Sequence, residues 1–249
     1  MPHVSATSVT RDDLVGAVRT GIAALADPAK AAPMQAYMKS AMPYRGVTAQ
    51  PLSRFFKDLF DRERLDTEDD WHEAVLALWD GARFREERYA ATTLARHRHY
   101  REHQQPQTLG LYLHLVVTGA WWDHVDEVAT HLVRGLLERH PDAITPHLHG
   151  WARDQHLWVR RSAIVCQVGR RDDLDRDLLV DVVDANLDGS SRTTPAESPY
   201  GREFFVRKAI GWALRDHART DPEWVRAFVA DRGGRLSGLS RREALRHLG

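Results

Sequence analysis

The sequence predicts an all-α fold, a curved α-solenoid of stacked HEAT-like helical repeats. Apolar residues recur at helical spacing behind capping residues, and three segments align without gaps, at 84–97, 157–170 and 204–217. With the Trp-rich stretch that begins at Trp121, the starts lie 37, 36 and 47 residues apart. A helical repeat of this length predicts helix pairs that bury their apolar faces against neighbouring pairs.

The first half of the chain carries two capping signals. Thr10 with Asp13, and Thr67 with Asp70, each place a hydroxyl three residues before a carboxylate at the start of an apolar-periodic stretch. The second stretch predicts an amphipathic helix with an apolar face formed by Trp71, Ala74, Val75, Leu78 and Trp79.

The second half begins with an ambiguous stretch. Apolar residues alternate with period two between Leu109 and Val117, which alone suggests a strand. Because every neighbouring segment is helical, we favour a buried helix there. Later helices are indicated at 125–136, at Asp221–Pro222 with Gly233–Gly234 as the end, and at Ser240 with Glu243 as the cap of the last one.

Composition limits the class of protein. Lys+Arg and Asp+Glu both number 35 in 249 residues, so any basic surface must come from segregation of charge. The single cysteine, Cys166, excludes an intramolecular disulfide, and no signal peptide or membrane span is visible. We expect one domain over 1–249, monomeric and cytoplasmic, without membrane partners. The stretch 189–195 is too rich in Gly, Ser, Thr and Pro to propagate a helix, which accounts for the long third interval.

One stretch combines an aromatic surface with a carboxylate. Trp122 and Asp126 are four residues apart and share a face of a helix. A π surface beside an anion suits a cation, or a sugar that becomes cationic as it reacts. The alternative is a core tryptophan and a solvated or capping aspartate. Stacked repeats could bring this pair near Arg161 and Trp212.

Bases recur at one position of the aligned segments: Arg88, Arg161 and Lys208 each follow an apolar residue by four positions. Bases on successive stacked helices could follow a phosphate backbone, although solvated faces with i,i+4 pairs remain the alternative. His99 and His103 share a helix face, but no cysteine and no acid is suitably placed beside them, so no metal and no cofactor is predicted. Cys166 lies in an apolar run and is expected to be packed and inert.

Six motifs occur in an order that resembles the AlkD family of DNA alkylation repair proteins, over nearly the whole chain. They are Tyr37-Met38-Lys39; Leu78-Trp79 with Phe84-Arg85-Glu86-Glu87-Arg88; Trp121-Trp122-Asp123 with Val125-Asp126; Leu157-Trp158-Val159-Arg160-Arg161; Phe204-Phe205-Val206-Arg207-Lys208 with Trp212 and Arg215; and Leu239-Ser240-Arg241-Arg242-Glu243-Ala244.

The resemblance implies a curved stack of HEAT-like repeats that excises alkylated bases from duplex DNA. By position, it implies that Asp126 is the catalytic carboxylate, that Trp122 and Trp212 hold the lesion-bearing nucleotide, and that Arg161 holds the backbone. The expected DNA-binding residues are Tyr37, Lys39, Arg88, Lys208, Arg215, Arg241 and Arg242. The sequence departs from the family at Gly169, where a base is usual, and in a longer loop at 189–201.

The predicted function is therefore a DNA N-glycosylase that excises cationic N3- or N7-alkylated purines from double-stranded DNA. Simple methyl lesions and bulky natural-product adducts both remain open, the second implying self-resistance. The alternatives are a helical-repeat protein that binds DNA structures without catalysis, and a repeat scaffold for protein partners.

Overall fold

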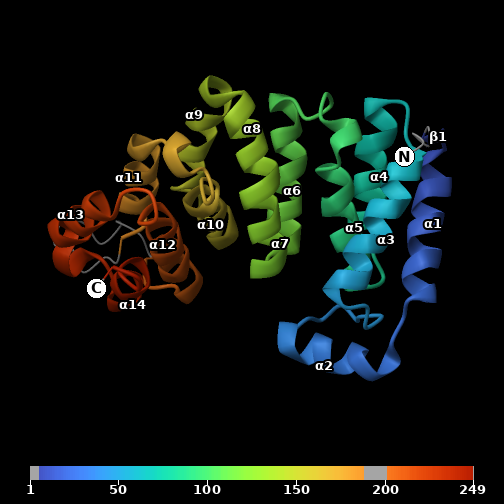
Figure 1. Ribbon diagram of the computed structural model, residues 1–249, viewed down its shortest axis with the longest axis horizontal. Coiled ribbons are helices and arrows are strands. Elements are labelled where there is room, and N and C mark those ends of the chain that lie inside the picture. The colour runs from blue at the N-terminus through green and yellow to red at the C-terminus, as the bar shows by residue number, and fades with distance from the viewer. Residues whose placement is uncertain (1–5, 188–200, 249) are drawn as a thin grey trace. The chain divides into compact units, whose positions relative to one another are not determined.

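The computed structural model describes residues 6–187 and 201–248 and confirms the predicted all-α class (Figure 1). Within these residues the extended elements are β1 (Thr7–Ser8) and β2 (Glu63–Arg64), which pair in parallel. The chain divides into two compact units, Met1–Gln104 and Gln105–Gly249. The loop predicted at 189–195 lies outside the described residues. None of the helices in the described part is long and apolar enough to cross a membrane.

The first unit contains α1 to α5, and two of its helices begin at the predicted caps. The Oγ1 atoms of Thr10 and Thr67 accept hydrogen bonds from the backbone N–H groups of Asp13 and Asp70, at 3.2 and 3.0 Å. The helices are α1 (Arg11–Ala24), α2 (Pro28–Met38), α3 (Ala49–Arg62), α4 (Glu68–Trp79) and α5 (Arg85–Ala95).

The core of the first unit is aromatic. Trp71 and Trp79 on α4 are at most 1% exposed, and the Trp71 ring stacks on Tyr100 with centroids 6.0 Å apart. The indole N–H of Trp71 donates to the carbonyl of Leu94 at 3.3 Å, so the polar atom of this ring is satisfied inside the core. Burial of each such side chain contributes roughly 1.5–3 kcal/mol or more.

The second unit contains α6 to α14. The stretch with period two forms α6 (Leu109–Gly119), as favoured. Its buried residues recur at helical spacing, whereas Val117 of the alternating set is exposed. The remaining helices are α7 (Trp122–Glu127), a π-helical stretch (Val128–Val133), α8 (Arg134–Arg139), α9 (Pro141–Trp151), α10 (Leu157–Val165), α11 (Arg176–Asp184), α12 (Phe204–His217), α13 (Pro222–Arg232) and α14 (Gly238–Ala244).

The three aligned segments are equivalent in the structure, since each coincides with the start of a helix. Phe84 is the N-cap of α5, and Leu157 and Phe204 are the first residues of α10 and α12. The bases predicted at matching positions therefore lie near the starts of these helices. Arg88 is the fourth residue of α5, and Arg161 and Lys208 are the fifth residues of α10 and α12. Assignment of these helices to HEAT repeats stays a prediction.

One cap was predicted at the wrong residue. The Oγ of Ser237, not that of Ser240, accepts the capping hydrogen bond of α14, at 3.0 Å from the backbone N–H of Ser240. Ser240 is buried, and its hydroxyl donates to the carbonyl of Arg207 on α12 at 2.9 Å. The helix thus begins one turn earlier than expected. By contrast, Asp221 caps α13 as predicted, accepting from the N–H of Trp224 at 2.9 Å.

Candidate active site

A bidentate ion pair joins α7 to α10 in the second unit. The Nε and Nη2 atoms of Arg161 donate to the two carboxylate oxygens of Asp126, at 2.7 and 2.8 Å. These two residues are 35 positions apart in the sequence. The parallel pair of charge-assisted bonds fixes the plane of the carboxylate as well as its position.

The pair is partly withdrawn from water. The Arg161 side chain is 6% exposed and the Asp126 side chain 18% exposed. Burial raises the pKa of Asp126 above its ordinary value, and the hydrogen bonds and charge of Arg161 act in the opposite direction. With 18% of its side chain exposed, Asp126 stays partly accessible to solvent while both of its carboxylate oxygens are bonded to Arg161.

The same guanidinium reaches a third helix. Nη1 of Arg161 donates to the backbone carbonyl of Phe205, in the first turn of α12, at 2.6 Å. Helices α7, α10 and α12 consequently meet at one side chain. Three of the five N–H donors of Arg161 are used in this way.

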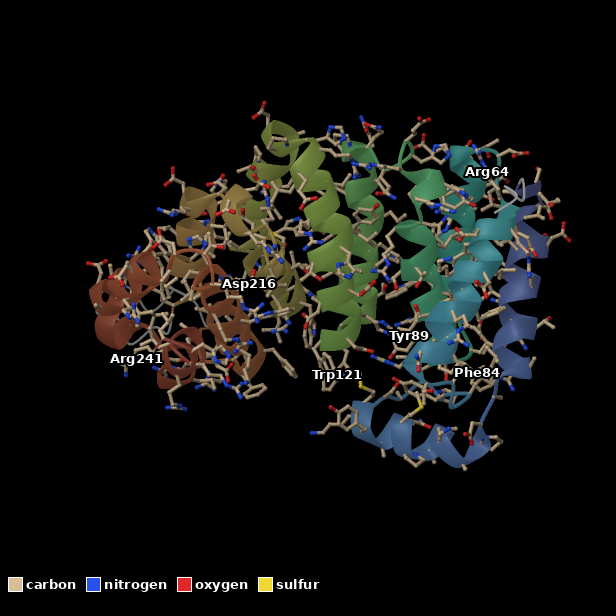
Figure 2. All side chains as sticks on the ribbon, in the orientation of Figure 1. Arg64, Phe84, Tyr89, Trp121, Asp216 and Arg241 are labelled. Atoms are coloured by element: carbon tan, nitrogen blue, oxygen red, sulfur yellow. The ribbon has the colours of Figure 1, made fainter. Side chains whose placement is uncertain are left out.

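An aromatic cluster adjoins the ion pair through Phe205, whose ring centroid lies 5.9 Å from Cζ of Arg161. Ring centroids of Trp158 and Phe205 are 4.8 Å apart, and Trp121 lies 5.4 Å from Phe205 and 6.0 Å from Trp158. Phe204, 51% exposed, continues the cluster with its ring 5.4 Å from Phe205. Trp121 precedes α7 and is labelled in Figure 2. Low-dielectric rings beside a charged pair strengthen its electrostatic interactions.

Trp121, Trp158 and Phe205 were not predicted as site residues from the sequence. Each precedes a predicted site residue on the same chain segment, but this position alone does not distinguish an aromatic residue beside a site from one in a core. Trp158 and Phe205 lie three residues before Arg161 and Lys208, which places each pair on one side of a helix.

The predicted tryptophans occupy the helices of this cluster. Trp122 is the first residue of α7, half-buried, one turn before Asp126. Trp212 is a half-buried residue of α12, seven positions after Phe205 and so on the same side of that helix, about 10 Å further along its axis. That Trp122, Trp212, Arg161 and Asp126 act on one nucleotide stays a prediction.

The helix widens directly after the carboxylate. Residues 128–133 are π-helical, and the hydroxyl of Thr130 donates to the carbonyl of Asp126 at 2.7 Å. Such stretches are uncommon and are frequent at functional sites, because they change the direction of side chains within one helix.

Two predicted DNA-binding bases on α12 share an acidic partner from α14. Nζ of Lys208 lies 2.8 Å from Oε1 of Glu243, and Arg215 donates to the other carboxylate oxygen. These contacts lower the pKa of Glu243, with the hydrogen bond from Lys208 as the largest cause. Arg241 and Arg242 on α14 are exposed, and Figure 2 labels Arg241. Lys208 and Arg215 are thus paired, while the two α14 bases are exposed to solvent.

Gly169, which stands where a base was expected, has a structural reason to be glycine. Its φ is +87°, in the region that favours glycine, and a Cβ there would lie 2.6 Å from Nη1 of Arg134. Arg134 donates to the carbonyl of Val168 at 2.8 Å, so a guanidinium already occupies the space beside this position.

The DNA-binding residues predicted in the first unit differ in how far they are exposed to solvent. Tyr37, near the end of α2, is 78% exposed, and Lys39, which follows that helix, is exposed with φ of 50°. Arg88 is partly buried and lies over the ring of Trp79, with its Cζ 4.7 Å from the centroid. Tyr37 and Lys39 are therefore more accessible to a ligand than Arg88.

His97 and Cys166 make their contacts within the protein. Nε2 of His97 lies 3.2 Å from Asp61, and the ring packs edge-on against His99. In residues 6–187 and 201–248 no group of three or more His, Cys, Asp or Glu is placed to hold a metal ion. Cys166 is fully buried, as expected, and burial raises the pKa of its thiol to about 12.

Comparison with known proteins adds a family and a solved relative. The model of a family described as "DNA alkylation repair enzyme" matches residues 18–248. A solved structure titled "Predicted DNA alkylation repair enzyme from Enterococcus faecalis" is 26% identical, with a TM-score of 0.71 over 90% of this chain and 97% of that one. No curated protein sequence gives a significant match.

Proposed function

The chain belongs to the DNA alkylation repair enzyme family, with a role in the repair of alkylated DNA, and from this premise we propose that it is a DNA glycosylase. Its substrates would be N3- and N7-alkylated purines in duplex DNA. The observation that supports this most is the Asp126 carboxylate, held rigidly by Arg161 in a partly buried aromatic environment and still partly accessible to solvent.

The chemistry needs little acid catalysis. Alkylation at N3 or N7 gives the purine a positive charge, so the base departs with the electron pair of the glycosidic bond. Positive charge then develops on the deoxyribose. The fixed carboxylate of Asp126 would stabilise that charge and orient the water whose oxygen bonds to C1′, accepting its proton directly or through solvent.

Arg161 would position Asp126 and also contact the DNA backbone. Three of its donors hold Asp126 and the carbonyl of Phe205, which sets the carboxylate before substrate arrives. The remaining donors suit a phosphate oxygen of the lesion-bearing strand.

Trp122 and Trp212 would flank the deoxyribose. Each residue is half-buried, and a π face of each ring would contact a sugar with cationic character. Such contacts contribute roughly 0.5–2 kcal/mol each, depending on how far they are desolvated. Their effect grows with the charge on the sugar, so it favours the transition state.

DNA binding would use bases distributed along the chain. Arg241 and Arg242 are exposed, and Lys208 and Arg215 retain donors beyond those given to Glu243. Contacts of this kind are sensitive to salt, because each releases a counterion from the duplex. We propose that a monomer binds the duplex, in the cytoplasm and without a cofactor.

Analysis of the product tests the assignment. Incubation with a duplex that contains 7-methylguanine should release the free base and leave an abasic site, detected by strand cleavage in alkali. Tight binding without release of base would favour the non-catalytic alternative, and absence of salt-sensitive binding would favour a protein scaffold. A parallel duplex with a bulky N3 or N7 adduct determines whether such lesions are also substrates.

A further inference from the structure

Glu86 is a buried carboxylate whose partners are backbone N–H groups. It is 0% exposed, and Oε1 accepts hydrogen bonds from the N–H groups of Arg45, Gly46 and Val47 at 3.0, 2.9 and 3.1 Å. Oε2 accepts from Arg45 as well, at 3.0 Å. Three successive N–H groups around one anion form a nest, and each bond is charge-assisted.

This nest belongs to the segment 39–48 that joins α2 to α3. Other residues at the start of α5 hold the same segment. The backbone N–H of Arg85 donates to the carbonyl of Pro43 at 2.9 Å, and its Nη1 donates to the hydroxyl of Ser40 at 3.1 Å. Figure 2 labels Phe84 and Tyr89 at this end of α5, near α2. The first turns of α5 thus fix the segment at several points.

Helix α2 depends on that segment for its position. All residues of α2 are described, and among them only Met38 is buried, so the helix gains little from core packing. The N–H of Asp27, its N-cap, donates to the carbonyl of Arg45 at 2.9 Å. Gly46 has φ of +84°, and a Cβ there would lie 2.0 Å from the carbonyl oxygen of Asp27. Figure 1 shows α2 lying across the ends of the other helices of the unit.

What α2 presents to solvent is an aromatic ring and a base. Tyr37 is 78% exposed, and Lys39 follows at the end of the helix. We propose that Glu86 is a positioning residue, which places Tyr37 and Lys39 for contact with DNA by fixing the segment 39–48. The inference rests on the proposed function, since it assigns the ligand of α2 from that function.

The neighbouring Glu87 provides a matched control. It is also buried, 3% exposed, on the same helix. Its carboxylate accepts from the N–H groups of Arg83 and Phe84 at 3.3 Å and from Nε of Arg19 on α1 at 2.9 Å. Loss of its charge affects α1 and the start of α5, and leaves the nest at residues 45–47 intact.

The first experiment compares Glu86→Gln with Glu87→Gln. Glu86→Gln removes the charge of the acceptor and replaces either Oε1 or Oε2 by an NH2 group that faces the N–H of Arg45, so hydrogen exchange should accelerate in residues 27–48. The dissociation constant for a fluorescent duplex should rise about tenfold, the loss of about one charge-assisted bond. Glu87→Gln should lower Tm comparably but leave exchange in residues 27–48 and DNA affinity near those of the parent.

A double-mutant cycle tests whether Glu86 acts through α2. Tyr37→Ala should weaken DNA binding, and adding Glu86→Gln should weaken it by less than the sum of the two separate free-energy effects, because only the contribution of Lys39 remains to be lost. Should Glu86→Gln fail to fold, Gly46→Ala perturbs the same segment without touching the carboxylate, and the same loss of affinity is expected.

The outcomes separate this inference from the proposed function. Equal effects of the two glutamate variants on exchange in residues 27–48, or additive effects with Tyr37→Ala, would overturn the role of Glu86. If exchange changes as expected but the parent protein neither binds nor cleaves alkylated duplex, Glu86 still fixes α2, while both the DNA ligand and the proposed function are wrong.

Discussion

Replacement of Arg161 by lysine should destabilise the protein and slow base excision together. Lysine keeps the positive charge but cannot donate two parallel bonds to Asp126 at 2.7 and 2.8 Å and a third to Phe205 at 2.6 Å. Loss of one or two charge-assisted bonds at a buried site costs about 2–4 kcal/mol of unfolding free energy. A carboxylate displaced by about 1 Å should lower the single-turnover excision rate by up to about 100-fold.

Arg160→Lys is the matched control for this prediction. Arg160 is 7% exposed and donates to the carbonyls of Ala152 and Arg153 and to the side chain of Asn186, away from Asp126. Urea unfolding should show destabilisation in both variants, whereas only Arg161→Lys should lose excision at a temperature where both are folded. Parental stability and rate in Arg161→Lys would refute the positioning role of its guanidinium.

Three further predictions follow from the charges of the structure. Glu243→Gln frees the two bases of α12, so DNA binding should tighten and the slope of log K against log salt should steepen by up to about two, roughly 0.9 for each base that gains a phosphate contact. Glu223, whose side chain is 86% exposed, is the control, and a change no larger than that of Glu223→Gln would contradict this. Burial lowers the pKa of His97 and of His217, so the stability that their neutral forms contribute is complete above about pH 6.5 and declines as pH falls toward the folded-state values. Calorimetry should show Tm falling between pH 7 and 5, and a constant Tm would exclude this contribution of the neutral histidines to stability. Burial raises the pKa of Asp126 above its ordinary value of 3.8. In a profile of excision rate against pH, the midpoint of the acid limb should therefore lie above that value.

Much of the fold could be predicted because its signals are local. Thr10 and Thr67 cap helices through contacts three residues away, and apolar spacing fixes the face that each helix buries. Ser237 and Ser240 show where local signals fail, since each lies three residues before a polar residue and either could be the cap. A contact 33 positions away, from Ser240 to the carbonyl of Arg207, decides that Ser240 is buried and that Ser237 is the cap.

The site was predictable only in part for a similar reason. The resemblance identified Asp126 and Arg161 as site residues, but no pattern showed that they bond to each other across 35 positions. The aromatic cluster of Trp121, Trp158 and Phe205 was missed because a tryptophan or phenylalanine at a helix start has the same local pattern in a core as beside a site.

The most direct test of the account is the single-turnover rate of Asp126→Asn on a 7-methylguanine duplex, with enzyme in excess and above the dissociation constant. The asparagine keeps the shape and can still accept one bond from Arg161, but it cannot balance positive charge on the deoxyribose. We expect the rate to fall at least about 100-fold, with folding and DNA affinity retained. Abasic sites formed at the parental rate by the folded variant would contradict a catalytic role for this carboxylate.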